Sequence, residues 1–582
     1  MKMITSLLKK GVLFASLAAL LLSVSAAELS DPADAVSRQI KTYDLVIENG
    51  RVIDPETGRD EVATVAVADG VIERISAEKS FKPKAEKVID ASGLVVSPGF
   101  INTHTHEGGE ADTEKNLSPA TRLMVHDGVT FWLGGNCGMS PTGVNIPFDD
   151  EGNSLKRGDP DKSLATFLDE AENVPLYNHY GTLTGNLTLR SNAGLRHMEK
   201  ESDEDIEKMK DILDRDLAAG SFGVSYGVMY DMGTTKKSMV ELARVSEDAG
   251  GMAASHTRYP TFNLNHLFFG LDNVVLKSSI CEAIDTCRKS GVPFIVSHIT
   301  DMAQSDSARW TLDTIDHAIR EESLPLVGDI IGHDYLGNDF YVLTFKGKLP
   351  IWFMLKLGDY EMEQFYVAQD VYVDGELYLE KYGQVTLEEA EFLRKNMDRV
   401  ESAGDKPGLG LICRIIPPKD TKLALSYPWV FIGNDHGGRV LDPETGELDP
   451  RMPRGLGTFS RLLGHWSRQE GALTMKQALF KATIAPAMWL GLDQKGRLQK
   501  GCDADIVVFD PDTVIDRARW LHDKEHLKPK GISYVIVNGE VVTDHGEPTG
   551  NTPGRVIRRT WEIPGNTRKV LDLYEERFKG NP

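Results

Sequence analysis

The sequence predicts an α/β protein in which a (β/α)8 barrel fills the middle of the chain and a small β-sandwich domain is built from both ends. Short apolar runs alternate with helical patterns over residues 99–490, which is typical of βα units around a parallel sheet. Both ends of the 582-residue chain are rich in short strands, whereas the middle is not. Residues 340–425 interrupt the alternation and predict an insertion before the last barrel strand.

The two parts of the β-sandwich domain are expected over residues 43–98 and 491–560. Asn49-Gly50 follows a strand pattern and is a hairpin signal, and Asp54–Gly58 predicts a further turn. Near the other end, a second strand pattern meets Asn538-Gly539, another hairpin signal. These turns divide both segments into short antiparallel strands.

The candidate barrel strands are short apolar runs separated by helical patterns such as Asp203–Ala219. Their number favours a closed barrel over an open sheet. They are Gly99–Ile101, Val129–Leu133, Gly223–Tyr226, Met252–Ser255, Phe294–Ser297, Leu326–Gly328 and Trp429–Gly433.

The expected insertion at 340–425 begins with an aromatic-rich stretch, Phe340–Val373. A helix is predicted to begin near Thr386, with Glu389 placed to complete a capping box. Long insertions in such folds are often lids, so the segment is expected either to cover the barrel mouth or to pack on its flank.

The first residues are typical of a secretory signal peptide, expected at residues 1–27. Lys9 and Lys10 precede an apolar run, Val12–Leu22, and small residues follow it. The run is too short to span a membrane comfortably, and no cysteine follows it for lipid attachment. We therefore expect cleavage, no stable membrane anchor, and a periplasmic or secreted protein.

Composition narrows the classes of partner. Hydrophobic residues make up 41% and charged residues 26% of the chain, which is ordinary for a folded soluble protein. The formal net charge of -22 repels a phosphate backbone, so nucleic-acid binding is not expected. The five cysteines are an odd number, so at least one is unpaired or intermolecular, and a metal would account for it.

Candidate metal ligands lie where predicted strands end. His104 and His106 are two residues apart and point to the same face of an extended strand. In a barrel, strand ends converge on one mouth, where the active site lies. Each such residue alone is more often structural, but their joint occurrence favours a site for zinc or a similar ion. The other members are Cys137, His256, His298 and Asp435.

The motifs around these residues resemble the amidohydrolase superfamily, and in particular the D-aminoacylase (N-acyl-D-amino-acid deacylase) family. The resemblance covers about Tyr43 to Arg558, and Gly135-Asn136-Cys137-Gly138 narrows it to this family. The matching segments are Pro98–His106, Gly135–Gly138, Ser225–Gly233, Ser255–Arg258, Val296–His298, Gly433–Asp435, Gly457–Arg461, Gly501–Asp510, Pro548–Gly550 and Pro553–Val556.

The resemblance implies a site for one or two zinc ions. His104 and His106 would bind one ion and His256 and His298 the other, while Cys137 would bridge them or hold the tighter one as a thiolate. The implied reaction is hydrolysis of a linear amide by a metal-bound hydroxide, most simply removal of the acyl group from an N-acyl-(D-)amino acid.

The resemblance also implies roles around the metal. Asp435 would be the general base and also a metal ligand. Tyr230 would donate to the oxyanion, although a core aromatic is nearly as good an interpretation. Arg454 and Arg258 would bind the substrate carboxylate, and a surface arginine is the alternative for both.

Four positions depart from the family pattern and leave the substrate open. Thr300 stands where a lysine is usual, Ile331 where a tyrosine is usual, Asn186 where a histidine is usual, and Glu107 where an aspartate is usual. The alternatives are hydrolysis of another C–N bond, such as that of a cyclic amide or a dipeptide, or an exported binding protein without catalysis.

Overall fold

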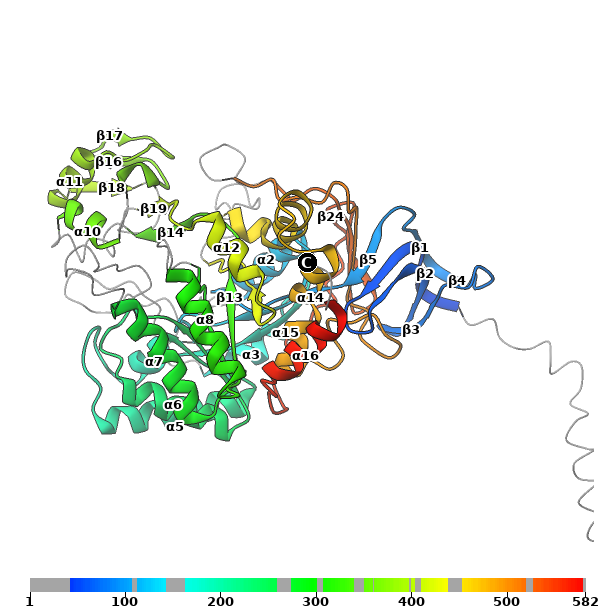
Figure 1. Ribbon diagram of the computed structural model, residues 1–582, viewed down its shortest axis with the longest axis horizontal. Coiled ribbons are helices and arrows are strands. Elements are labelled where there is room, and N and C mark those ends of the chain that lie inside the picture. The colour runs from blue at the N-terminus through cyan, green and yellow to red at the C-terminus, as the bar shows by residue number, and fades with distance from the viewer. Residues whose placement is uncertain are drawn as a thin grey trace, which may run out of the picture.

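The computed structural model describes residues 42–106, 113–142, 163–258, 274–300, 307–339, 350–358, 361–396, 399–402, 410–437, 453–519 and 527–578 (Figure 1). The signal peptide expected at residues 1–27 and the unusual Glu107 lie outside these ranges. Among the described helices, none combines the length and the apolar character that crossing a membrane requires.

Strands from both ends of the chain form one β-domain. Its sheet has nine strands in the order β24-β23-β22-β21-β5-β1-β2-β3, with β4 paired to β1. Buried residues from both ends, such as Val65 and Ile506, share a single core cluster, as expected for a sandwich built from both termini. The strands are β1 (Thr42–Asp54), β2 (Arg59–Ala68), β3 (Val71–Ser76), β4 (Lys84–Asp90), β5 (Val95–Pro98), β21 (Ile506–Phe509), β22 (Ile532–Val537), β23 (Glu540–Asp544) and β24 (Glu547–Pro548).

Two of the predicted turns of the β-domain join strands. The prediction of a hairpin at Asn49-Gly50 is wrong. Asp54–Gly58 leads from β1 into β2, and Asn538-Gly539 leads from β22 into β23. Asn49 instead lies inside β1, where its φ of 61° coincides with a register shift against β2. A β-bulge accommodates the same left-handed backbone that a tight hairpin needs, so the local sequence does not distinguish the two.

The middle of the chain forms the barrel. Parallel pairs link its strands in two runs, β6-β7-β8 and β9-β10-β11-β12-β13-β20, and β8 and β9 are neighbouring pieces of one strand. The strands are β6 (Phe100–Asn102), β7 (Val129–Gly134), β8 (His179–Thr182), β9 (Thr184–Gly185), β10 (Gly223–Gly227), β11 (Met252–His256), β12 (Phe294–Val296), β13 (Leu326–Ile330) and β20 (Val430–Ile432).

The strand at His179–Gly185 is missing from the sequence prediction. It carries His179, Tyr180 and several small polar residues rather than an apolar run, so its composition is not typical of a buried strand. The barrel closes between β20 and β6, where Thr105 and His436 form a parallel bridge and the His106 amide donates to the His436 carbonyl at 2.8 Å.

Helices surround the barrel strands, and a last helix, α16 (Thr567–Phe578), packs against α15. The predicted helix at Asp203–Ala219 is α5, which begins with a capping box at Ser202. The surrounding helices are α2 (Thr113–Val125), α3 (Leu164–Ala171), α4 (Asn186–Asn192), α5 (Asp203–Ala219), α6 (Lys236–Asp248), α7 (Val274–Ser290), α8 (Ser307–Arg320), α12 (Pro418–Leu425), α14 (Met475–Ala482) and α15 (Ile484–Leu490).

A subdomain with its own core separates β13 from β20. It begins at Leu336 rather than at residue 340, because β14 pairs with β19, and it ends before α12, which packs against α8 of the barrel. Thr386 and Glu389 form the predicted capping box of α11. Its elements are β14 (Leu336–Asp339), α10 (Ile351–Gly358), η1 (Met362–Gln364), β15 (Phe365–Val367), β16 (Val371–Val373), β17 (Glu376–Leu379), α11 (Leu387–Lys395), β18 (Val400–Ser402) and β19 (Gly410–Cys413).

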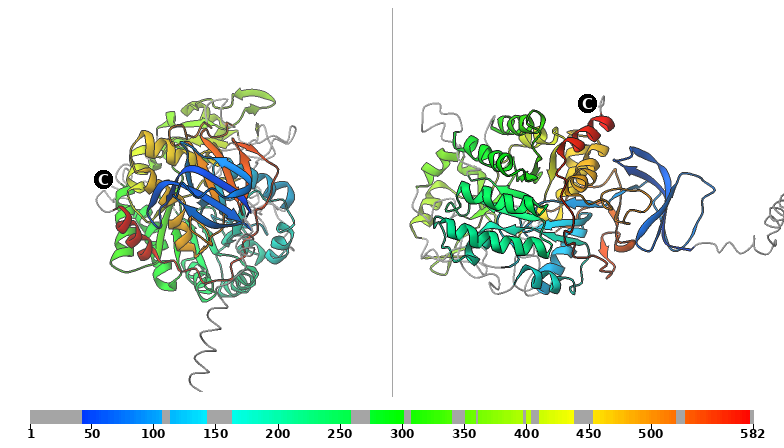
Figure 2. Two further views of the ribbon diagram at one scale, coloured as in Figure 1. Left: turned by 90° about the vertical axis from the view of Figure 1, so that its right-hand side faces the viewer. Right: turned by 90° about the horizontal axis from the view of Figure 1, so that it is seen from below.

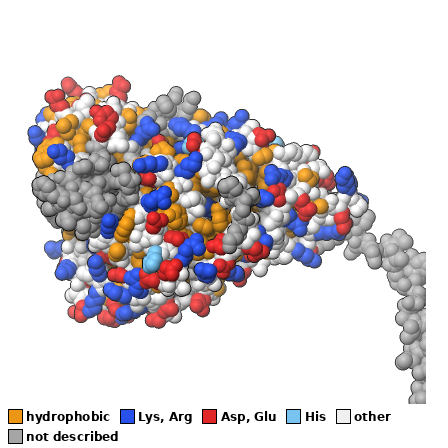
Figure 3. Space-filling model, viewed as in Figure 1, with side chains coloured by type: hydrophobic (Ala, Val, Ile, Leu, Met, Phe, Trp, Pro, Cys, Tyr) orange, Lys and Arg blue, Asp and Glu red, His pale blue; other side chains and the backbone are white. Residues whose placement is uncertain are grey.

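The β-domain and the insertion lie at opposite ends of the barrel (Figure 2). The chain enters β6 directly from β5 of the β-domain, whereas the insertion leaves from the carboxyl end of β13. The insertion is therefore on the same side as the strand ends that carry the candidate ligands. On the face shown in Figure 3, acidic and basic side chains are intermixed.

A buried ion network joins the β-domain to the barrel. The Lys495 ammonium lies 2.7 Å from Asp505 and 2.8 Å from Asp503, and His179 at the start of β8 lies 3.3 Å from Asp505. Burial opposes the charge on Asp505, but Lys495 and His179 outweigh it and hold the pKa of that carboxyl below its usual range. The network stabilises the contact only while both signs of charge are present.

We predict that Lys495→Met lowers the free energy of unfolding by about 3–5 kcal/mol, because it leaves a buried carboxylate without its cation. The matched control is Lys476→Met, whose ammonium lies 3.2 Å from Asp60 with 39% of its side chain exposed. That exposed pair should contribute less than about 1 kcal/mol. Denaturant titration followed by tryptophan fluorescence measures both, and equal losses would contradict the role of the network.

Candidate metal centre

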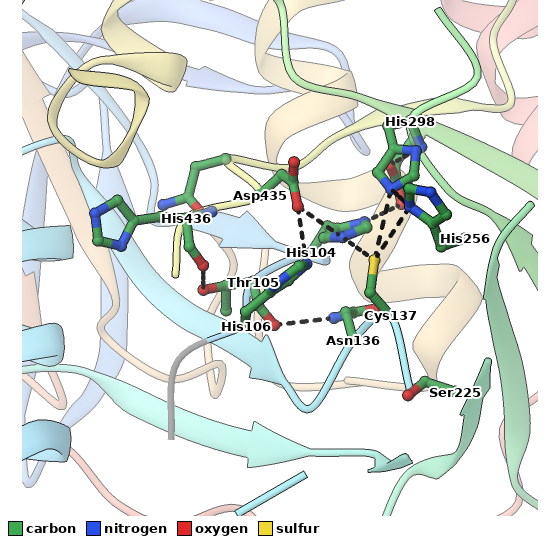
Figure 4. Close-up of polar contacts among 12 residues, drawn as sticks. His104, Thr105, His106, Asn136, Cys137, Ser225, His256, His298, Asp435 and His436 are labelled. Carbon is green, nitrogen blue, oxygen red and sulfur yellow. Dashed lines mark hydrogen bonds and ion pairs between the residues drawn. The ribbon is translucent and has the colours of Figure 1, made fainter. Parts of the chain in front are cut away.

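Six side chains converge at the barrel mouth (Figure 4). All come from the carboxyl ends of barrel strands or from the loops directly after them. One ligand atom from each of His104, Cys137, His298 and Asp435 lies within 4.8 Å of the other three. The structure thus brings together all six predicted ligands, the other two being His106 and His256.

Cys137 and Asp435 occupy the centre of the group. The Cys137 sulfur lies 3.4 Å from His104 Nε2, 3.5 Å from His298 Nε2 and 3.8 Å from His256 Nδ1. One oxygen of Asp435 lies 3.2 Å from His104 Nε2 and 3.0 Å from His106 Nε2. His256 and His298 form the other side, with Nδ1 and Nε2 2.7 Å apart. Cys137 is therefore placed between two pairs of imidazoles.

Three of the ligands have a left-handed backbone. The φ angles are +54° at Cys137, +36° at His298 and +45° at Asp435. Such a conformation costs a non-glycine residue on the order of 1 kcal/mol or more and is retained where the surroundings enforce it. In each case the chain turns sharply as a strand ends, which directs the side chain into the mouth.

The loop that carries Cys137 is held by neighbouring strands. Ser225 of β10 donates to the Gly135 carbonyl at 2.5 Å and accepts from the Gly138 amide at 3.0 Å. At Gly138, φ is +80° and a Cβ would lie 2.6 Å from the Gly227 nitrogen, so only glycine fits there. The Gly-Asn-Cys-Gly motif is therefore needed for the shape of the loop as well as for the thiol.

Asp329, at the end of β13, supports two of the histidines and was not predicted as a site residue. One carboxylate oxygen lies 3.0 Å from His104 Nδ1, and the other accepts the His298 backbone amide at 2.6 Å. A carboxylate on the second imidazole nitrogen fixes the tautomer and the ring orientation of a metal-binding histidine. The sequence signal was a polar residue directly after the predicted apolar strand Leu326–Gly328.

The electrostatics favour anionic ligands. Burial opposes ionisation of Cys137, but His106 and His104 outweigh it and hold the pKa of the thiol well below its usual range. Burial likewise opposes the charge on Asp435, but Arg454 and His104 hold the pKa of that carboxyl well below its usual range. A thiolate and a carboxylate among imidazoles are a donor set for zinc.

His106 and His256 differ in their affinity for protons. Burial opposes protonation of His106, but Cys137 and Asp435 outweigh it and raise its pKa to about 9. Burial, reinforced by His298, lowers the pKa of His256 to about 4. His256 is therefore a neutral imidazole at neutral pH, which is the form that binds a metal.

The remaining predicted residues have different surroundings. The Arg454 guanidinium is buried, and its Nη2 lies 2.7 Å from Asp435. The ring of Tyr230 lies with its centre 4.8 Å from that of His256. Arg258 instead pairs with Glu282 through two contacts, at 2.9 and 3.1 Å, and donates to the Thr234 carbonyl. These contacts already occupy the Arg258 guanidinium. Its role in substrate binding stays a prediction.

The departures from the family pattern are explained in part by packing. Ile331 belongs to the core cluster of the insertion, so this position supports the subdomain instead of projecting a polar group. Asn186 accepts the Gly227 amide at 2.9 Å and donates to Thr234 at 3.0 Å. Thr300 is buried, and its hydroxyl has no hydrogen-bond partner among the described residues.

Comparison with known proteins places this site among amidohydrolases. Residues 427–542 match the model of the amidohydrolase family. The chain is 28% identical over 528 residues to a D-aminoacylase of Alcaligenes xylosoxydans xylosoxydans, covering 89% of this chain and 98% of that protein. It is 28% identical over 530 residues to an N-acyl-D-glutamate deacylase of the same organism, covering 90% and 98%.

A solved structure is similar over the same extent. An N-acyl-D-glutamate deacylase from Bordetella bronchiseptica, complexed with zinc and a phosphonate mimic of the tetrahedral intermediate, superimposes with a TM-score of 0.71. The sequence identity is 25%, and the match covers 89% of this chain and all of the other. The likeness spans the β-domain and the barrel together.

Asp329→Asn should weaken metal binding about 10- to 100-fold, because the amide cannot hold His104 as a carboxylate does. Zinc affinity measured by competition with a chromogenic chelator tests this. Asp334→Asn is the matched control, since Asp334 pairs with Arg414 at 3.0 Å, and its affinity should equal that of the wild type. Unchanged affinity in Asp329→Asn would refute the supporting role.

Proposed function

Because the chain belongs to the D-aminoacylase family of the amidohydrolase superfamily and is a metal-dependent amidohydrolase, we propose that it deacylates an N-acyl-D-amino acid. The observation that carries this proposal is Arg454. Its guanidinium is buried beside the metal ligands, and Nε and Nη1 have no hydrogen-bond partner among the described residues. A buried cation with unused donors fits a ligand that brings a carboxylate.

The residues fit zinc, one or two ions per chain. The donors are a thiolate, four imidazoles and a carboxylate, which suit zinc, and Cys137, close to His104 and His298, would hold one ion or both. When bound, zinc supplies an activated water molecule and polarises the amide carbonyl. The zinc-bound relative of similar fold supports this assignment.

Asp435 moves the proton in the proposed reaction. The oxygen of a water molecule bonds to the amide carbon, the carboxylate of Asp435 accepts the water proton, and the C–N bond breaks as that proton passes to the leaving nitrogen. The products are a carboxylic acid and a free amino acid. Arg454 at 2.7 Å fixes the orientation of the carboxylate that makes this transfer.

Arg454 also binds the substrate in this proposal. Its fork geometry matches a carboxylate, which would place the α-carboxylate of the amino acid beside Asp435 and the scissile amide over the metal ligands. Tyr230, which lies against His256, is proposed to donate its hydroxyl to the carbonyl oxygen as negative charge develops there. We further propose that the protein acts after export, through the leader expected at residues 1–27.

Chelation of the metal should abolish hydrolysis of N-acetyl-D-amino acids, and added zinc should restore it. Asp435→Asn should lower kcat by about 10²- to 10⁴-fold, because the proton acceptor is lost. Asp374→Asn, a change on the exposed surface of the insertion, is the control and should keep full activity. Turnover that survives both chelation and Asp435→Asn would refute the proposed mechanism.

A substrate panel with Arg454→Met tests the carboxylate assignment. For N-acyl-D-amino acids, kcat/KM should fall about 10- to 100-fold more than for the corresponding amino-acid amides, which carry no carboxylate. The ratio of the two losses removes any general effect of Arg454 on Asp435. Activity of the wild type on cyclic amides alone, or on N-acyl-L-amino acids alone, would reject the proposed substrate.

A further inference from the structure

His256 contacts a thioether on the side of its ring that faces away from the other ligands. Its Nδ1 faces Cys137 and His298, whereas its Nε2 lies 3.1 Å from the sulfur of Met229. A thioether has no proton to give and can only accept. A hydrogen bond to Met229 therefore requires the hydrogen on Nε2, which leaves the lone pair of Nδ1 on the side of Cys137 and His298.

We propose that Met229 is a positioning residue for the metal centre, selecting the tautomer and the ring orientation of His256 through an Nε2–H···S hydrogen bond. The inference rests on the proposed function, because it assigns His256 to a metal. Histidines that bind metals usually donate their second nitrogen to a carboxylate, a carbonyl or water, and here a methionine takes that place.

His104 and His256 are consequently supported by hydrogen-bond acceptors of different strength. Asp329 gives His104 a charged acceptor at 3.0 Å, which both orients the ring and increases its basicity. Met229 gives His256 a weak, uncharged acceptor, which orients the ring and adds little basicity. Met229 thus contributes to the orientation of His256 more than to its basicity.

Hydrogen bonds fix the backbone turn that carries Met229. Met229 follows β10 in a turn closed by the Tyr230 amide, which donates to the Gly227 carbonyl at 2.9 Å. The buried carboxylate of Asp231 then accepts the Gly233 amide at 2.9 Å and the Arg190 guanidinium at 3.0 Å. With the turn fixed on both sides, Met229 and the ring of Tyr230 together confine His256.

The test separates hydrogen bonding from packing. Met229→Leu keeps an apolar side chain of similar volume but removes the acceptor, and Met229→Gln restores an acceptor as a carbonyl. Met232→Leu, in the same turn, is the matched control. The readout is zinc affinity, from competition with a chromogenic chelator, together with the visible spectrum of the cobalt-substituted protein, whose bands report ligand geometry around Cys137.

Met229→Leu should weaken binding of one ion about tenfold or more and alter the cobalt spectrum, while Met229→Gln and Met232→Leu stay close to the wild type. If Met229→Leu binds zinc as tightly as the wild type, or if Met229→Gln is as weak as Met229→Leu, the hydrogen-bonding role is overturned. A wild-type protein that binds no metal would instead overturn the proposed function, so the two failures are distinguishable.

Discussion

The closure of the barrel between β20 and β6 is the constraint on which the site depends. The Asp435 amide donates to the His104 carbonyl at 2.9 Å, and the Thr105 hydroxyl donates to the His436 carbonyl at 2.9 Å. Gly433 permits this approach, since a Cβ there would lie 2.4 Å from that of His104. Asp435, the proposed general base, and His104, more than three hundred residues apart, therefore become neighbours only when the barrel closes.

Closure of the barrel alone does not orient the side chains of the candidate ligands. Their orientation also depends on a strained backbone and on buried hydrogen-bond partners. Cys137, His298 and Asp435 each adopt a left-handed conformation at the end of a strand. The cost is met by hydrogen bonds that exist only in this geometry, such as that from the His298 amide to Asp329 at 2.6 Å. Ligand placement and fold stability are thus coupled, because the same contacts serve both.

The sequence predicted which side chains converge, because strand ends meet at one mouth in any barrel. It predicted less where a residue's role depends on neighbours that are distant in the sequence. The sequence did not predict the strand at His179–Gly185, because its polar residues are buried by partners far along the chain. Asn49-Gly50 is a bulge and not a hairpin, since its left-handed backbone suits both. Asp329 and Met229 could not be assigned roles, because their meaning lies in which imidazole nitrogen they contact.

The centre combines features that follow from the barrel with features of the surrounding loops. The ligands and their supports are determined by the ends of the barrel strands, which every closed barrel must present at the same mouth. The substrate side is built from loops, and here one of them belongs partly to the insertion, whose core includes Ile331. Because that position stabilises a subdomain, it is not available to bind substrate. In the proposed function, recognition then depends on Arg454, whose guanidinium also contacts the proposed proton acceptor Asp435. If both proposed roles hold, substrate binding and proton transfer share one residue, and a substitution of Arg454 that changes specificity also alters the orientation of Asp435.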